Sequence, residues 1–481
     1  MIVILKALQE CTDLEIYNNL VRGYSGKSHI SDRVEVLIRA GQKMSLTTRR
    51  DCLKYLGMNF RIMLNINADV SDAEVGEIFL REHIAVHLEH SNDKFRVICL
   101  LIEKLYALVS NEIQPDNLDS LCNHEVLLPG HLYTMILREK LEEILQGIRF
   151  KLFKDASKAG ESIKIRDLAY LKKAIESQTT IGRKLEYFLS TGNLKSQSGL
   201  DLMQAKGYTI IAEKLNNMRF LSHFRSIHRG AFFAEMKTTA VRKLLPENWG
   251  FMCPVHTPDG HPCGLLNHIT ESCQVLSSSS LTEKHFNLEK VLISLGMEPI
   301  GPELSLIYPS SFYTVLLDGK VIGYVNPELM PAVIENLRRL KVMQFEEMLV
   351  PRDLEIGLIP KGKFEKTVQF PGLYLSTREA RMIRPVKNLL LNREELISPF
   401  EQVYLSIACS EEDIRSDTTY QEINPGNILS ILAGNIPFLE YNQSPRNMYQ
   451  CQMAKQTMGT PYHNYPYRFD NKVMKNIILF N

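Results

Sequence analysis

Several features that would assign a protein to a narrow class are missing from this sequence of 481 residues. No apolar run approaches the ~18 residues that a membrane-spanning helix needs. The start, MIVILKALQECTDLEIY, has a short apolar core and no basic segment before it, so it is a poor secretory signal. With 56 basic and 55 acidic residues, the formal net charge of +1 gives no global attraction to nucleic acid. We therefore expect an intracellular protein, in which any nucleic-acid binding depends on local patches.

The nine cysteines include no Cys-x-x-Cys pair, and their number is odd, which favours free thiols in a reducing compartment. A group of cysteines and histidines does occur just past the middle of the chain: Cys253, His256, His261, Cys263, His268 and Cys273. Zinc ligands usually come in pairs two to four residues apart, and few of these residues approach that spacing. We predict no metal here, while the rival interpretation, a metal-dependent hydrolase, predicts stoichiometric zinc.

The first half of the chain is predicted to be mainly helical. In residues 132–148, LYTMILREKLEEILQGI, apolar side chains recur at helical spacing, with charged ones opposite. Residues 95–109, FRVICLLIEKLYALV, have a broader apolar face, which indicates a helix within a core. Pro129-Gly130 marks a helix start before residue 132.

Strands and turns are predicted after Pro258. Residues 312–325, FYTVLLDGKVIGYV, are two β-rich runs joined by Asp318-Gly319, a strong hairpin signal. A helix is predicted for residues 327–341, with Pro327 near its start, and a further β-rich segment for residues 366–391. Separate blocks of helix and strand favour a multidomain α+β protein.

The most basic stretch lies between residues 200 and 245. Its cations are Lys206, Lys214, Arg219, Arg225, Arg229, Lys237, Arg242 and Lys243, interleaved with Tyr208, Phe220, Phe224, Phe232 and Phe233. Cations neutralise phosphates while aromatic faces stack on bases, so the stretch suits single-stranded nucleic acid. On composition alone, a solvated basic face over an aromatic core is an equally good interpretation.

A polar segment, residues 442–459, brings Arg446, Tyr449, Lys455 and Gln456 together after the apolar run 428–439. A guanidinium forms two-pronged contacts with phosphate, an ammonium acts as a point charge, and tyrosine adds a flat face with a hydroxyl. The set suits a phosphate-bearing ligand, although residue types alone are explained more simply by a solvated charged turn.

The Pro- and Gly-rich run WGFMCPVHTPDGHPCGL, residues 249–265, is predicted to be a rigid loop, because these residues restrict or free φ at fixed points. A histidine such as His256 can gain charge near neutral pH, but we interpret it as a satisfied structural residue.

Three ordered blocks resemble the second-largest subunit of multisubunit DNA-directed RNA polymerases. NQSPRNMYQCQMAKQTMG resembles the family's SPRNxYQ…KQxMG signature, and NWGFMCPVHTPDGHPCGLLNHIT resembles its WGxxCPxxTPxGxxCGLxxxL segment. Residues 186–245 are similar to the family's fork region. RGAFFAEMKTTAVRKLLP together with CPVHTPDG resembles the RNA polymerase I version. The similarity extends from about Val3 to Asn471.

The resemblance implies a domain order. Residues 1–75 correspond to the end of the lobe, 76–155 to the second part of the protrusion, 156–250 to the fork, 251–345 and 346–425 to the two external domains, and 426–472 to the start of the hybrid-binding domain. Residues 473–481 are a divergent tail. The chain therefore resembles a subunit truncated at both ends: a partial chain, an alternative product or an imperfect gene model.

The resemblance also implies site residues. It carries Arg446 to the phosphates of the incoming nucleotide and Tyr449 to the side of the catalytic centre, as the catalytic residues. It places Lys455 and Gln456 near the RNA–DNA hybrid. The implied nucleic-acid contacts of the fork are Lys195, Arg225, His228, Arg229 and Arg242. His256 stands where the family frequently has a carboxylate, which puts any role of that carboxylate in doubt here.

The implied activity is nucleotidyl transfer in DNA-templated synthesis of the ribosomal RNA precursor, in the nucleus and nucleolus. The implied partners are the largest subunit, other polymerase subunits, template DNA, the transcript and nucleoside triphosphates. The resemblance also implies that Mg²⁺ in the assembled enzyme is held mainly by the largest subunit, which carries the family's paired-carboxylate loop; this chain shows no such loop. We expect the isolated chain to be inactive. The rival hypothesis is a non-catalytic fragment that binds nucleic acid or polymerase subunits.

Overall fold

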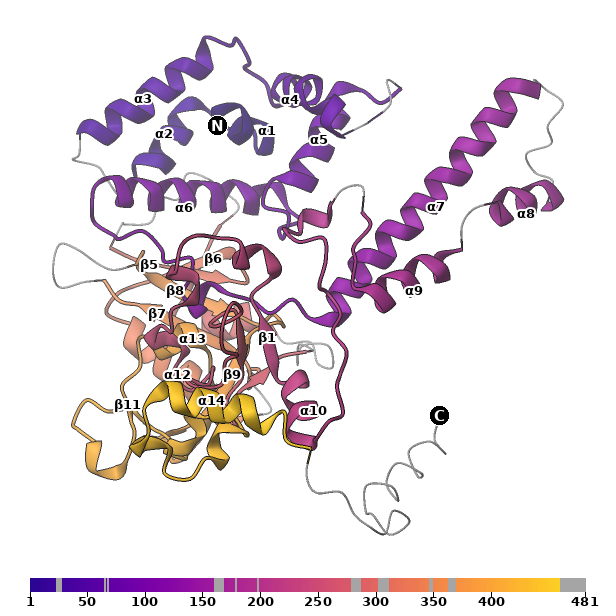
Figure 1. Ribbon diagram of the computed structural model, residues 1–481. Coiled ribbons are helices and arrows are strands. Elements are labelled where there is room, and N and C mark those ends of the chain that lie inside the picture. Colours follow the sequence, from indigo (N-terminus) through magenta and orange to yellow (C-terminus); the bar gives the residue numbers. More distant parts are fainter. Residues whose placement is uncertain are drawn as a thin grey trace. The chain divides into compact units, whose positions relative to one another are not determined.

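The computed structural model describes residues 1–22, 28–64, 66, 69–159, 168–177, 180–196, 199–277, 287–301, 311–345, 349–361 and 369–458. The chain divides into two compact units, each built from two separate stretches (Figure 1). Unit 1 comprises residues 1–125 and 274–425, and unit 2 comprises residues 126–273 and 426–481. The predicted divergent tail, 473–481, lies outside the described residues.

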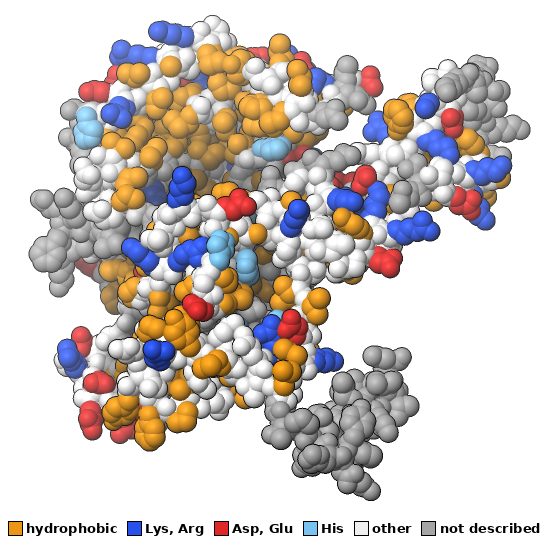
Figure 2. All heavy atoms as spheres, viewed as in Figure 1, with side chains coloured by type: hydrophobic (Ala, Val, Ile, Leu, Met, Phe, Trp, Pro, Cys, Tyr) orange, Lys and Arg blue, Asp and Glu red, His pale blue; other side chains and the backbone are white. Residues whose placement is uncertain are grey.

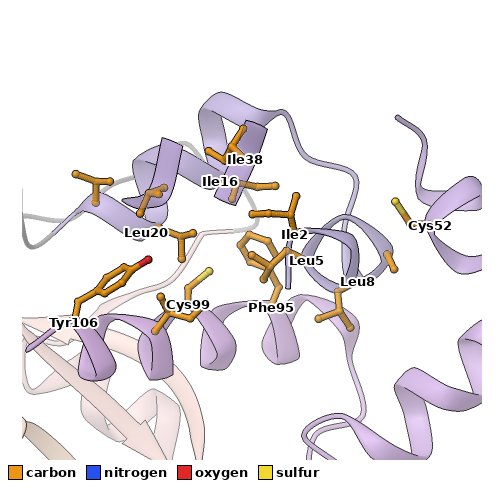
Figure 3. Packing of buried hydrophobic residues seen from close by; sticks show 14 of the residues in the cluster. Ile2, Leu5, Leu8, Ile16, Leu20, Ile38, Cys52, Phe95, Cys99 and Tyr106 are labelled. Atoms are coloured by element: carbon orange, nitrogen blue, oxygen red, sulfur yellow. The ribbon is translucent and has the colours of Figure 1, made fainter. Parts of the chain in front are cut away.

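The first stretch of unit 1 is helical. Its helices are α1 (Ile2–Leu8), α2 (Asp13–Val21), α3 (Ser28–Gln42), α4 (Arg49–Leu64), α5 (Asp72–His83) and α6 (Ser91–Val109). Reciprocal capping boxes begin α2, through Thr12 and Glu15, and α5, through Ser71 and Glu74. The helices enclose an apolar core in which Leu5, Ile16 and Phe95 are almost completely buried (Figure 3). The helix predicted for residues 95–109 is confirmed as part of α6.

The second stretch of unit 1 contributes two five-stranded sheets in the described part of the chain. One has the order β4 (Glu298–Pro299), β6 (Lys320–Val325), β5 (Tyr313–Leu317), β8 (Gly372–Ser376), β7 (Glu355–Ile359). The other has the order β10 (Arg393–Ile397), β9 (Met382–Asn388), β12 (Tyr420–Gln421), β11 (Ile407–Ala408), and β3 (Gln274–Val275) also pairs with β9. Its helices are α11 (Leu288–Ser294), α12 (Met330–Met343) and α13 (Pro399–Gln402).

The predicted hairpin is confirmed: β5 and β6 are antiparallel, and Asp318 and Gly319 both have positive φ, +49° and +81°. Positive φ at both central residues is the type I′ geometry that matches strand twist. The helix predicted for residues 327–341 begins later, at Met330. Its first turn contains Pro331 rather than Pro327, because a turn around Asn326 comes first. Strands β8 and β9 confirm the β-rich segment over its described part.

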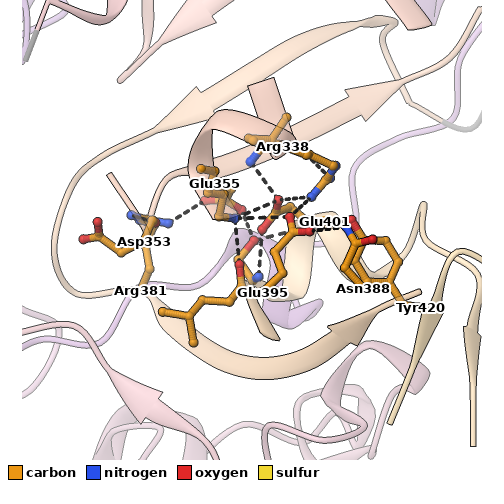
Figure 4. Close-up of polar contacts among 12 residues, drawn as sticks. Arg338, Asp353, Glu355, Arg381, Asn388, Glu395, Glu401 and Tyr420 are labelled. Carbon is orange, nitrogen blue, oxygen red and sulfur yellow. Dashed lines mark hydrogen bonds and ion pairs between the residues drawn. The ribbon is translucent and has the colours of Figure 1, made fainter. Parts of the chain in front are cut away.

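Charged side chains are buried where α12, β10 and α13 of unit 1 meet (Figure 4). The Arg338 Nη1 atom lies 2.5 Å from Glu395 and 3.2 Å from Glu401. The Lys341 ammonium lies 3.7 Å from each of these carboxylates. Tyr420 and Asn388 donate further hydrogen bonds to Glu395, so this carboxylate is satisfied from several sides.

Unit 2 contains α7 (Pro129–Ala159), α8 (Leu168–Glu176), α9 (Ile181–Thr191), α10 (Asn217–Phe224), β1 (Ser226–His228), β2 (Leu266–His268) and α14 (Ser444–Ala454). The helix predicted for residues 132–148 is confirmed within α7. Buried Ile136 of α7 packs with Leu185 and Phe188 of α9. Figure 2 shows basic, acidic and hydrophobic side chains mixed over the projecting α7–α9 segment on the face in view. Strands β1 and β2 are antiparallel, with Ser226 opposite His268.

Helices and sheets in separate stretches confirm a multidomain α+β protein. The finer domain boundaries stay a prediction. Among the helices of the described segments, none combines the length and apolarity that crossing a bilayer requires.

Candidate functional site

Helix α14 presents the predicted catalytic residues on its exposed side. Pro445 lies in its first turn, a position where a missing N–H costs nothing. Asn447 and Cys451, four residues apart, form the buried face, and the Asn447 side chain donates to the Leu439 carbonyl. Arg446 and Tyr449 therefore lie on the opposite side, and both are exposed.

The Arg446 guanidinium lies over the Tyr449 ring, 5.9 Å from its centre, in a cation–π arrangement. In the part of the chain that the structure describes, no carboxylate forms an ion pair with Arg446. Burial against an internal acid would have excluded a ligand role, and this is not what the structure shows. The guanidinium keeps its donors available for an external anion.

The two predicted hybrid contacts differ in exposure. Gln456 is exposed, whereas Lys455 is only 7% exposed. The Lys455 ammonium lies 3.4 Å from Nε2 of His268, a residue of β2 that is itself buried. As placed here, the Lys455 side chain points into unit 2.

His268 and His256 form a stacked pair, with ring centres 3.6 Å apart and planes within 4°. Nδ1 of His268 lies 3.0 Å from the carbonyl oxygen of His256, so it must carry the proton and donate. In the neutral ring, Nε2 of His268 is then an acceptor facing Lys455. Nδ1 of His256 lies 2.7 Å from the buried Ser430 hydroxyl.

Burial keeps both imidazoles uncharged. Burial, followed by the charges of His268 and Lys455, lowers the pKa of His256 from 6.5 to about 2. Burial and the Lys455 charge lower the pKa of His268 to about 3. The same cause, loss of hydration, lowers the pKa of Lys455 from 10.5 to about 8. The burial of His256 and its bond to Ser430 agree with a structural residue, but the ring is satisfied only at Nδ1, because its buried Nε2 has no hydrogen-bond partner among the described residues.

Residues 249–265 form the predicted loop, without a helix or strand of their own. Thr257 fixes it by donating to Leu266 O and accepting from Gly264 N–H. Gly264 has φ +76°, and a side chain there would place Cβ 2.5 Å from the Arg242 carbonyl oxygen. Glycine is therefore required where the loop passes the Arg242 backbone.

Three of the residues predicted to contact nucleic acid in the fork donate hydrogen bonds to backbone carbonyls. Arg225 donates to the carbonyls of Thr270, Glu271 and Cys273. Arg242 donates to the carbonyls of His261 and Cys263. Arg229 donates to Val241 O and lies 5.0 Å from the Phe233 ring centre. Arg229 thus joins the basic segment to itself, Arg242 joins it to the loop, and Arg225 joins it to residues 270–273.

The other predicted contacts lie nearer the surface. Lys195 places its ammonium 4.0 Å from the centre of the Tyr187 ring, and its carbonyl accepts from buried Lys140. His228 is exposed, with Nδ1 accepting from Gly230 N–H. Lys206, Lys214, Lys237 and Lys243 of the same basic stretch are also exposed, as are Phe224 and Phe232. The exposure of these six side chains is compatible with nucleic-acid binding, and their role stays a prediction.

The sequence did not single out three residues that organise this region. The sequence indicates His268 only as a possible zinc ligand, and no motif in it indicates Ser430 or Asn216. Asn216 caps α10 by accepting from Arg219 N–H, and its amide donates to Ala454 O and Thr457 O at the end of α14. An Asn before a helical segment is a recognised cap signal, but its link to residues 238 positions away is not encoded locally.

Metal-binding groups are absent from the segments that the structure describes: no three His, Cys, Asp or Glu side chains come together there as a metal site would require. Cys253 is buried in an apolar cluster with Val255 and Cys451. A separate cavity of about 690 Å³ lies in unit 1, lined by residues that include His87, Tyr374 and Phe400. It contains none of the predicted site residues.

Comparison with known proteins shows the family to which the chain belongs. Residues 1–127, 210–275 and 432–479 match domains 2, 3 and 6 of RNA polymerase Rpb2, and residues 322–384 match the Rpa2-specific domain of RNA polymerase I. The DNA-directed RNA polymerase I subunit RPA2 of Euplotoides octocarinatus is 49% identical over 482 residues, which cover 99% of this chain and 41% of the relative. The human subunit RPA2 is 42% identical, covering 98% of this chain and 41% of the relative.

The chain thus belongs to the family of second-largest subunits of DNA-directed RNA polymerases. Within the family it is of the RNA polymerase I type, because it matches the Rpa2-specific domain and because relatives from ciliate to human carry that name. The fission yeast relative, a probable subunit RPA2, is 46% identical over 98% of this chain and 40% of its own length. The chain spans about 40% of the length of these curated relatives.

Proposed function

We propose that this chain contributes to the active-site cleft of RNA polymerase I, which synthesises the ribosomal RNA precursor on a DNA template. The observation that carries the proposal is the exposed pair Arg446 and Tyr449, held on a helix whose opposite face is buried. The basic fork-like segment belongs to the same unit. A phosphate-binding group and a nucleic-acid surface are both needed where a nucleoside triphosphate meets a template.

In this proposal Arg446 is an electrostatic clamp. Nucleotidyl transfer builds negative charge on the leaving pyrophosphate, and a preorganised guanidinium stabilises that charge without acting as an acid or base. Tyr449 lies under the guanidinium and limits its orientation. The cation therefore meets the phosphates with little loss of conformational freedom.

Mg²⁺ does not fit the residues that this chain offers around Arg446. Magnesium prefers carboxylate oxygens, and the exposed side of α14 presents a guanidinium and a phenol. The metals of the assembled enzyme would then be held mainly by the largest subunit. The role of this chain is to bind phosphate.

The nucleic-acid contacts of the proposal fall into two sets. Arg446, Lys195, His228 and Gln456, with the exposed lysines of the basic stretch, would contact phosphates or bases directly. Arg225, Arg229 and Arg242, which hold backbone carbonyls, would shape the fork and contact nucleic acid with their remaining donors. Lys455 belongs to neither set in the arrangement seen here.

The partners in the proposal are the largest subunit, other polymerase subunits, template, transcript and nucleoside triphosphates, in the nucleus and nucleolus. The regions would be the end of the lobe, the second part of the protrusion, the fork, the two external domains and the start of the hybrid-binding domain. The isolated chain should not synthesise RNA.

The test starts with the tagged chain expressed in its own cells and purified with whatever it binds. Recovery in a complete polymerase with template-dependent nucleotide incorporation supports the proposal. Recovery only in partial assemblies supports the rival fragment hypothesis. Incorporation by the isolated chain would contradict both.

In the recovered polymerase, we predict that Arg446→Ala lowers kcat/KM for nucleoside triphosphates by about 100-fold, because one preorganised cation is lost from the transition state. Arg446→Lys should recover only part of the activity, since a point charge replaces the two-pronged contact. Arg415→Ala is the matched control, because Arg415 is an exposed arginine in unit 1. An equal loss in both alanine variants would remove the assigned role of Arg446.

A further inference from the structure

Two residues, one before and one after the helix that carries Arg446 and Tyr449, contact the stacked histidines of unit 2. Ser430, upstream of α14, bonds to Nδ1 of His256 at 2.7 Å. Lys455, which directly follows α14, faces Nε2 of His268 at 3.4 Å. One rigid pair of rings therefore fixes the chain before and after the exposed site residues.

The rings are themselves fixed. His268 belongs to β2, and its backbone carbonyl accepts from Cys253 N–H at 2.9 Å. Its ring donates to the backbone of His256, so the loop and the strand set the position of the stack. Ser430 also accepts from Ala433 N–H, which leaves its hydroxyl proton for His256. In neutral His256 the ring proton is then on Nε2, which has no hydrogen-bond partner among the described residues.

The surroundings of Lys455 explain why it stays with the stack. Among the described residues, no carboxylate forms an ion pair with it. The titratable groups that face it are His268 and His256, with Cys451 of α14 and Arg219 and His223 of α10. Glu213, whose charge acts on His223, is paired with Arg219. His268 Nε2 is thus the acceptor that the structure provides for the buried ammonium.

We infer that His256 and His268 form a positioning clamp for residues 430–455, and that Lys455 is a positioning residue of this clamp rather than a contact to nucleic acid. The clamp sets the direction in which α14 presents Arg446 and Tyr449. The consequence for nucleotide binding rests on the proposed function, whereas the clamp itself does not.

The first experiment measures amide hydrogen exchange in α14 of the full chain. His268→Phe keeps the stacked ring but removes the acceptor from Lys455, and an unsatisfied buried charge favours local opening. We expect protection of α14 to fall about tenfold, the value of one charge-assisted hydrogen bond. Adding Lys455→Met removes the orphaned charge and should restore protection to within about twofold of the wild-type chain.

His261→Phe is the matched control, because His261 is an exposed histidine of the same loop. It should leave exchange in α14 unchanged. Trp249, the single tryptophan of the chain, lies in unit 2 and reports by its fluorescence whether each variant is folded. Wild-type protection in His268→Phe, or no recovery in the double variant, would overturn the clamp.

The second experiment uses the polymerase that contains the chain. His268→Phe should raise KM for nucleoside triphosphates while the salt dependence of template binding stays unchanged. Lys455→Met should leave that salt dependence unchanged as well, whereas loss of a phosphate contact would reduce its slope by about one. A reduced slope would return Lys455 to the nucleic-acid contacts. Failure of the chain to assemble would count against the proposed function, and the exchange experiment would still decide the clamp.

Discussion

Lys341 of unit 1 and Lys455 of unit 2 are both buried, and their ammonium groups have different neighbours. Lys341 of α12 is 1% exposed, lies 3.7 Å from both Glu395 and Glu401, and donates to the Leu396 carbonyl. Lys455 is 7% exposed and faces an uncharged imidazole. Carboxylates compensate the charge of Lys341, whereas Lys455 faces a neutral acceptor.

The difference determines which charges can change near physiological pH. Burial alone would raise the pKa of Glu395, but Lys341 and Arg338 outweigh burial and hold it below its usual value. The Glu395 carboxylate therefore remains ionised. Without a counter-ion, burial lowers the pKa of Lys455 to about 8, so the clamp of unit 2 exchanges a proton at mildly alkaline pH.

The largest expected effect comes from breaking the network of unit 1. Glu395→Gln leaves Arg338 and Lys341 with one buried carboxylate instead of two, and it should lower the free energy of unfolding of unit 1 by about 3–5 kcal/mol. Hydrogen exchange of β9 and β10 under increasing denaturant measures this change. Glu394→Gln, an exposed neighbour on the same strand, should stay within about 0.5 kcal/mol of the wild-type chain. Equal effects would show that the network contributes nothing specific.

A smaller effect is expected from acid in unit 2. Unfolded histidines take up a proton below pH 6.5, whereas folded His256 and His268 stay neutral until about pH 2 and 3. Stability from each ring is thus present above pH 6.5 and is lost as pH falls, by about 2 kcal/mol at pH 5. Urea unfolding followed by Trp249 fluorescence measures it. The loss of unfolding free energy as pH falls below 6.5 should be smaller in His268→Phe than in the wild-type chain. It should be unchanged in His261→Phe. A flat wild-type profile would contradict the neutral stack.

The smallest effect is expected from Lys455→Met. At pH 7 the lost hydrogen bond is offset by removal of a buried charge, so the free energy of unfolding should change by less than about 1 kcal/mol. Between pH 8 and 10.5 the unfolded wild-type chain binds one more proton than the folded chain, so wild-type stability rises with pH. The variant should lack this rise. If the free energy of unfolding of the variant still rises between pH 8 and 10.5, another titrating group causes the rise.

The local patterns predicted much of the fold. Apolar side chains at helical spacing located α6 and the first part of α7, and Asp318-Gly319 located the hairpin of β5 and β6. The start of α12 was missed by three residues, because Pro327 and Pro331 are both compatible with a first turn. The grouping into two units was not predictable, since each joins stretches that lie far apart in the sequence.

For the candidate site, residue types predict the exposure of single side chains but not their tertiary contacts. Arg446 and Tyr449 are exposed on one helix, as a phosphate-binding role requires. The burial of Lys455 could not be predicted from its local sequence, a polar segment in which the next residue, Gln456, is exposed. Lys455 contacts His268, which is 187 positions away. The guanidinium groups of Arg225 and Arg242 hold carbonyls that no spacing in the sequence identifies.

The two-part construction of unit 2 also constrains the order in which the protein can acquire its structure. Residues 253–268 cannot bury Cys253 or satisfy His256 until Ser430, Leu432 and Cys451 have been synthesised. Residues 274–425 come between them, and at ~5–20 residues per second the ribosome needs roughly 8 to 30 s to make that stretch. By the end of this interval all residues of unit 1 are available to fold, while the first stretch of unit 2 still exposes apolar side chains. We therefore expect chaperones to bind this stretch during synthesis.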